Sequence, residues 1–259
     1  MKFLTRFLLL LLLSLILGCN VSKKIIEEVE PAKVSLKVED TIRFASYNVS
    51  MFRDAEGALE NELTNPISPQ VQRVAAVVQQ VKPDVLALME FDFDADSRAL
   101  ASFKHNFLEI SQNGSDTIEY KYACSIISNT GVLSVVDLNG DGQVNLPNDA
   151  FGFGNFPGQF AFAILSKYPF DLDNFRTFRE FKWKDLPEAN LPVNADGSSY
   201  YSDEALEVFR LSSKNHIDLP VILPDGERVH MILAHPTPCL LYTSPSPRDA
   251  TLSRMPSSA

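Results

Sequence analysis

Two sets of side chains alternate over residues 42–47 of the segment TIRFASYNVSMF, namely Ile42, Phe44 and Ser46 against Arg43, Ala45 and Tyr47. Such alternation predicts a β-strand with one buried face, and this strand should end near Asn48. Residues 85–89 form an unbroken apolar run that follows Pro83 and is too short for an ordinary helix. We therefore expect a second, buried strand that ends at Glu90.

Between these strands the apolar residues recur at helical spacing, as Val71, Val74, Ala75, Val78 and Val81. Ser68 is suited to the N-cap of this helix and Pro69 to its first turn. Strand, helix and strand in this order predict a right-handed crossover between parallel strands. A further helix is expected over residues 97–108 and a further buried strand over residues 160–165.

Parallel neighbours place Asn48 and Glu90 at the same end of the sheet. An amide oxygen beside a carboxylate suits a hard cation such as Mg²⁺, Mn²⁺ or Ca²⁺. The alternative is a solvated strand end with a turn-forming Asn. Asp92, Asp94 and Asp96 follow in alternation, as further ligands or, more simply, as a charged loop.

SYNVSMF followed by KPDVLALMEF resembles the two opening motifs of the endonuclease/exonuclease/phosphatase superfamily. These metal-dependent phosphoesterases include deoxyribonucleases, sphingomyelinases and inositol phosphatases. The resemblance implies that Asn48 and Glu90 hold the catalytic Mg²⁺ or Mn²⁺. It also implies an α/β fold, a two-sheet α/β sandwich of mainly antiparallel mixed sheets with outer helices.

Two later segments extend the resemblance. GQFAFAILSKYP is similar to the third strand motif of the superfamily. His235, which follows the expected strand over residues 229–234, resembles the His of the Thr-His-Leu element, although Ala234 and Pro236 replace its usual neighbours. In the superfamily this His acts on the phosphate or the leaving group, so the resemblance implies a catalytic role for His235.

The resemblance covers residues 42–238, roughly the first two-thirds of such a domain. The later Gly-Asp-x-Asn and Ser-Asp-His motifs are absent, and residues 239–259 resemble translated sequencing-adapter sequence. We therefore expect residues 41–238 to form an incomplete domain with a non-native tail. Because the groups that activate water would lie downstream, the 259-residue chain should be inactive or nearly so.

Residues 1–18 combine a positive start with an apolar stretch, as in a secretion signal. The sequence Ile16-Leu17-Gly18-Cys19 resembles the bacterial lipobox, which implies that Cys19 is lipidated after cleavage. Residues 19–40 would then be a tether, and the protein a lipoprotein anchored in the cell envelope. The alternative is a plain signal peptide with an incidental Cys.

Asp137, Asn139 and Asp141 fall at positions 1, 3 and 5 of a calcium loop, with Gly142 at the turn position. Asp149 lies one residue beyond position 12, where a bidentate Glu would be expected. A structural Ca²⁺ and an ion-free turn both fit this segment. Residues 131–136, which precede the loop, are expected to form a strand.

Two other segments are candidates for contacts with a substrate. Residues 171–203 are irregular and rich in aromatic side chains, as in a substrate wall or a surface loop. In residues 207–218, Arg210 and Lys214 accompany hydroxyl groups and suit a phosphate, although a solvated strand face is equally consistent. Asp225-Gly226 predicts a hairpin turn.

The net charge of −10 argues against a broad nucleic-acid-binding surface. A small-molecule or lipid head-group phosphoester is therefore favoured over nucleic acid. The expected function is a divalent-metal-dependent phosphoester hydrolase. The alternatives are a non-catalytic, calcium-stabilised binding lipoprotein and, within the same fold, a nuclease. The sequence carries no signal for an oligomeric state.

Overall fold

The structure, a computed structural model, describes residues 41–236. The predicted signal peptide, Cys19, the tether and the tail over residues 239–259 lie outside the described residues. Among the helices of residues 41–236, none is both long and apolar enough to cross a membrane.

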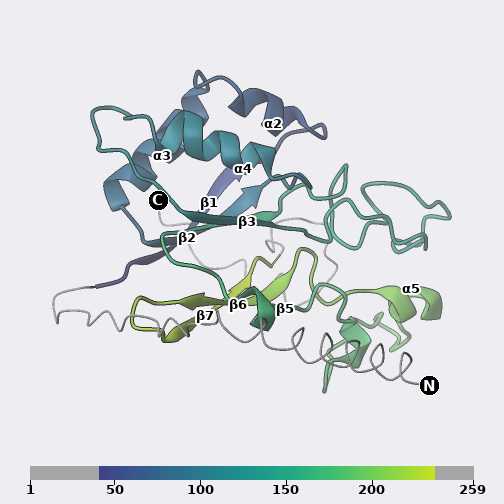
Figure 1. Cartoon of the computed structure of the whole chain (residues 1–259). Helices are drawn as coiled ribbons and strands as arrows, with labels where there is room; N and C mark the ends of the chain where they lie inside the picture. The colour runs from purple at the N-terminus through teal and green to yellow at the C-terminus, as the bar shows by residue number, and fades with distance from the viewer. Residues whose placement is uncertain (1–40, 237–259) are drawn as a thin grey trace, which may run out of the picture. The chain divides into compact units, whose positions relative to one another are not determined.

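The described chain forms two β-sheets with helices and long loops (Figure 1). In chain order the elements are β1 (Phe44–Met51), α2 (Ala58–Leu63), α3 (Pro69–Val81), β2 (Val85–Phe91), α4 (Arg98–Phe103), the π-helix η1 (Lys104–Leu108), β3 (Tyr122–Ile126), β4 (Phe162–Ser166), the 3₁₀ helix η2 (Leu172–Asn174), β5 (Arg176–Thr177), the 3₁₀ helix η3 (Trp183–Asp185), α5 (Asp203–Val208), β6 (His216–Ile222) and β7 (Arg228–Ala234).

The first sheet has four strands in the order β1-β2-β4-β3. β1 and β2 are parallel and joined by α3, as the crossover pattern predicts, whereas β4 runs antiparallel to both β2 and β3. Helices α2, α3 and α4 cover one face of this sheet (Figure 1). Ser68 occupies the N-cap position of α3, but its hydroxyl donates to Glu62 Oε1 at 2.6 Å instead of capping the helix.

The second sheet has three antiparallel strands in the order β5-β6-β7. The predicted hairpin at Asp225-Gly226 joins β6 to β7, and Gly226 takes the positive φ of 87° that the turn requires. Alternate residues of β2 pack against alternate residues of β6 in one apolar cluster. The chain is therefore an α/β sandwich of two packed sheets, as the sequence predicts.

Three local predictions are corrected by the structure. The strand expected over residues 131–136 is wrong, because this segment forms only an isolated bridge, between Leu133 and Ala150. Positive φ angles at Gly131 and Val135 interrupt the extended chain. β1 continues past Asn48 to Met51 through a register shift, and the expected helix over 97–108 changes from α to π geometry at Lys104.

Candidate functional site

Glu90 lies next to the end of β2, where the alternation of side chains is broken. Residues two apart on a regular strand share one face of the sheet. Here Met89 packs between the two sheets, whereas Phe91 packs into the helix-covered core. The left-handed backbone of Glu90, with φ at 61°, accounts for this reversal. Its carboxylate Oε1 lies 3.6 Å from Nε2 of His235, which follows β7.

Asn48 lies on the neighbouring strand β1, paired with Met89, one residue before Glu90. Its side-chain Oδ1 accepts the backbone N–H of Ser50 at 3.1 Å, which fixes the orientation of the amide. Asn48 and Glu90 therefore lie near the carboxyl ends of adjacent parallel strands, the placement predicted from the sequence. Their role as metal ligands stays a prediction.

Lys214 and His235 complete a cluster around Glu90. Lys214 is only 6% exposed, and its ammonium lies 5.9 Å from the centre of the Phe160 ring. Burial lowers the pKa of Lys214, and the Glu90 carboxylate opposes that change. Burial and then the charge of Lys214 lower the pKa of His235, again opposed by Glu90. Three ionisable groups thus act on one another at this edge of the sheets.

Residues 45–252 match the model of the Endonuclease/Exonuclease/phosphatase family. This chain belongs to that family. The domains of this family are of the phosphoesterase and nuclease type. The motifs at Asn48 and Glu90 that resemble the family are thus part of a match that extends over most of the chain.

Two solved structures are similar to the chain. The crystal structure of endonuclease/exonuclease/phosphatase from Beutenbergia cavernae DSM 12333 is 16% identical, with a TM-score of 0.32, over 75% of this chain and 37% of that chain. An endonuclease/exonuclease/phosphatase family protein from Leptotrichia buccalis C-1013-b is 11% identical, with a TM-score of 0.38, over 84% of this chain and 63% of that chain. The chain therefore spans less than two-thirds of either structure. A comparison with curated proteins gives no match.

Arg210 and Lys214, the two predicted phosphate-binding cations, have different surroundings in this family member. The guanidinium of Arg210 lies 3.9 Å from the ring centre of Phe151 and donates to Asn129 Oδ1 at 2.5 Å. It also lies 3.8 Å from a carboxylate oxygen of Glu180. These contacts hold Arg210 within the protein, whereas Lys214 is buried and its charge interacts with those of Glu90 and His235. Phosphate binding by Arg210 or Lys214 stays a prediction.

Asn129, which the sequence analysis overlooks, ties the Arg210–Lys214 segment in place. It is fully buried, and its side-chain amide donates to the carbonyls of Arg179 and Ser212, both at 2.7 Å. Its backbone N–H donates to the carbonyl of Lys214 at 2.8 Å. Asn129 lies in the segment Ser128-Asn129-Thr130-Gly131, which has no hydrophobic periodicity. Its structural role is therefore identified only by its contacts.

Asp92 lies in a loop, as expected, but its side chain is buried and not exposed. The side chain is 6% exposed and accepts the backbone N–H groups of Arg53 at 2.7 Å and Phe160 at 3.0 Å. Burial raises its pKa to about 6, against the lowering effect of these hydrogen bonds. Asp92 joins the end of β1 to the Phe160 backbone beside Lys214. Asp94 instead accepts the N–H of Arg98 at the start of α4.

The predicted calcium loop is held by hydrogen bonds within itself. Asp137 accepts the N–H groups of Gly140 and Gly142, and Asp141 accepts that of Gln143. The remaining predicted ligands, Asn139 and Asp149, accept backbone N–H groups as well. Across residues 41–236, no group of three or more His, Cys, Asp or Glu side chains is arranged to hold a metal ion. Calcium binding at this loop stays a prediction.

Proposed function

We propose that the protein is a divalent-metal-dependent phosphoester hydrolase that acts at the cluster of Glu90, Lys214 and His235. The observation that supports the proposal most strongly is this convergence from three separate segments in a domain of the family. Asn48 lies on the adjacent strand. The chemistry of the cluster, an acid, a buried ammonium and an imidazole, suits a phosphate and its leaving group.

The donor set fits Mg²⁺ or Mn²⁺. Glu90 and Asn48 offer a carboxylate and an amide oxygen, both hard ligands, and Mg²⁺ is commonly held by one or two protein oxygens together with water and substrate phosphate. When bound, the ion would polarise the phosphoryl oxygen and lower the pKa of a coordinated water. Glu90 and Asn48 are therefore the residues that would hold it.

Lys214 and His235 supply the remaining chemistry from this chain. The buried ammonium of Lys214 attracts a phosphate oxygen more strongly than an exposed lysine would, because the surrounding dielectric constant is low. Burial and the charge of Lys214 lower the pKa of His235, which favours its neutral form. A neutral imidazole donates a hydrogen bond from one nitrogen and accepts one at the other, so the role we assign to His235 is to hydrogen-bond the phosphate or the leaving oxygen.

The substrate we propose is a small-molecule or lipid head-group phosphoester. The net charge of −10 disfavours a long polyanion, and this supports such a substrate over nucleic acid. Lipidation at Cys19 would place the protein in the cell envelope, anchored to a membrane. The alternative functions are those of a nuclease and of a non-catalytic binding lipoprotein, and the experiments below distinguish them from the proposal.

The test measures turnover of bis-p-nitrophenyl phosphate and a lipid head-group analogue against Mg²⁺ and Mn²⁺ concentration. Because we propose that residues 239–259 are not native to the domain, the test compares the 259-residue chain with a chain in which a carboxyl-terminal segment bearing the Gly-Asp-x-Asn and Ser-Asp-His motifs replaces them. We expect turnover in the second chain and little or none in the first. Faster turnover of single-stranded or duplex DNA than of either small substrate would assign a nuclease.

Three variants separate the proposed roles. Glu90→Ala should abolish turnover and leave the melting temperature in chelator nearly unchanged. Asn48→Ala should raise the metal concentration needed for half-maximal rate. His235→Ala should lower the rate by about 10²–10⁴-fold with metal affinity kept. Asp116→Ala, at a carboxylate that is 80% exposed, is the matched control and should be fully active. Metal-independent turnover, or full activity in Glu90→Ala, refutes the proposal.

A further inference from the structure

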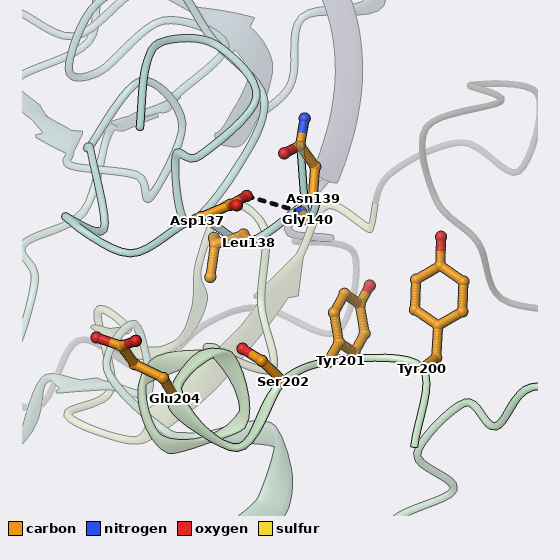
Figure 2. A pocket seen from close by; sticks show the side chains of 8 residues that line it. All are labelled: Asp137, Leu138, Asn139, Gly140, Tyr200, Tyr201, Ser202 and Glu204. Atoms are coloured by element: carbon orange, nitrogen blue, oxygen red, sulfur yellow. Dashed lines mark hydrogen bonds between the residues drawn. The ribbon is translucent and has the colours of Figure 1, made fainter. Parts of the chain in front are cut away.

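A cavity of about 270 Å³ opens beside the start of α5 (Figure 2). Two segments far apart in sequence form it, the predicted calcium loop and the end of the aromatic stretch. Its lining residues are Asp137, Leu138, Asn139, Gly140, Tyr200, Tyr201, Ser202 and Glu204. Asn48, Glu90, Lys214 and His235 are not among them, so the cavity is distinct from the proposed hydrolase site.

The walls of this cavity are fixed by packing and hydrogen bonds. Leu138 and Tyr201 are buried in one apolar cluster, in which the Tyr201 ring lies 4.9 Å from that of Phe209. The carboxylate of Asp137 accepts the N–H of Gly140 at 2.7 Å, the bond drawn in Figure 2. Ser202 accepts the N–H of Ala205 at 3.1 Å. The cavity is thus preformed, which lowers the entropic cost of binding a ligand.

The charge of the lining is uniformly negative. Asp137 and Glu204 line the cavity, and Lys, Arg and His are absent from the lining. Neither carboxylate has a salt-bridge partner in the part of the chain that the structure describes. By contrast Glu207, on the same helix as Glu204, pairs with Lys184 at 2.6 Å. A concave surface with two carboxylates and no cationic side chain in its lining attracts a cation.

The lining favours an organic cation over a metal ion. Ca²⁺ takes six to eight oxygen ligands, and the described residues gather fewer than three carboxylate or imidazole groups at any such point. Both Asp137 oxygens already accept backbone N–H groups. Tyr200 is 46% exposed, and its ring stands at 84° to that of Tyr201, with their centres 5.0 Å apart. Exposed tyrosine rings attract alkylammonium groups through cation–π interactions.

We propose that this cavity binds a small organic ammonium ion, with Glu204 and Asp137 supplying the negative charge and Tyr200 the aromatic contact. The volume suits a group of the size of a quaternary ammonium with a short chain. The proposal goes beyond the hydrolase function and does not depend on it. The same site would accept the ion free in solution or as part of a larger molecule.

The experiment titrates the full chain with choline chloride, at constant ionic strength, and follows broadening of the choline methyl signal by NMR. The uncharged isostere 3,3-dimethylbutan-1-ol is the reference ligand. We expect saturable binding of choline and much weaker binding of the alcohol. Glu204→Gln and Tyr200→Ala should each weaken choline binding about threefold, as expected for one exposed charge or one ring.

Glu207→Gln is the matched control, because Glu207 lies on the same helix, is paired with Lys184 and does not line the cavity. It should bind choline as the unaltered chain does. Glu204 and Tyr200 are exposed, and circular dichroism checks that their variants keep the fold. Equal binding of choline and the alcohol, or unchanged binding in both variants, overturns the proposal. Displacement of choline by micromolar Ca²⁺ would overturn it in favour of a metal site.

Discussion

The buried hydrogen bonds of Asn129 allow us to predict how much its substitution lowers the free energy of unfolding. Asn129→Ala removes three side-chain hydrogen bonds at a fully buried position, to the Arg179 and Ser212 carbonyls and the Arg210 guanidinium. A buried polar group left without a partner costs about 1–3 kcal/mol. The Ser212 carbonyl is buried, whereas water can reach the other two partners in part. We therefore expect the free energy of unfolding to fall by about 3 kcal/mol.

Urea denaturation, followed by circular dichroism, measures this change as a shift of the midpoint at constant slope. The matched control is Asn194→Ala, which removes the hydrogen bonds of an exposed Asn to Ser198 and Ser199. Surface substitutions of this kind change stability by less than about 0.5 kcal/mol. A loss in Asn129→Ala that is no larger than the loss in this control refutes a structural role for the Asn129 side chain.

Three further predictions can be checked directly. Labelled palmitate should be incorporated into the protein expressed in a bacterium and not into Cys19→Ser, and equal label in both would exclude lipidation. A Ca²⁺ bound at residues 137–149 would add about 2.7 kcal/mol of stability at a hundredfold excess over Kd and would be lost in Asp141→Ala. The melting temperature should therefore be higher in Ca²⁺ than in chelator, and equal melting temperatures would indicate the ion-free turn, with which the internal hydrogen bonds are also consistent. Hydrogen bonds from Arg176 and His230 hold the pKa of Asp218 below 3.8, so its contribution to stability is present above that pH and is lost as the pH falls. Asp218→Asn should therefore flatten the decline in unfolding free energy as the pH falls below 3.8.

Local periodicity determined the elements that frame the site. The apolar stripe from Val71 to Val78 packs α3 on the sheet, and the unbroken run of β2 is buried on both faces. The parallel crossover follows from the order of these elements, so the neighbouring positions of Asn48 and Glu90 could be predicted. The hairpin at Gly226 could also be predicted, because its turn needs a residue that tolerates positive φ.

The tertiary structure alone decided which polar groups are buried and what they contact. Asp92 and Asp94 occupy similar positions in the sequence. Asp92 is buried and accepts two backbone N–H groups, whereas Asp94 accepts the N–H of Arg98 at the start of α4. Asn129 and the cavity beside Tyr200 depend on segments that meet only when the chain folds. Periodicity reports which face of an element is apolar. The partners of a single buried polar side chain come from distant segments, and their positions are fixed only when the sheets and loops pack together.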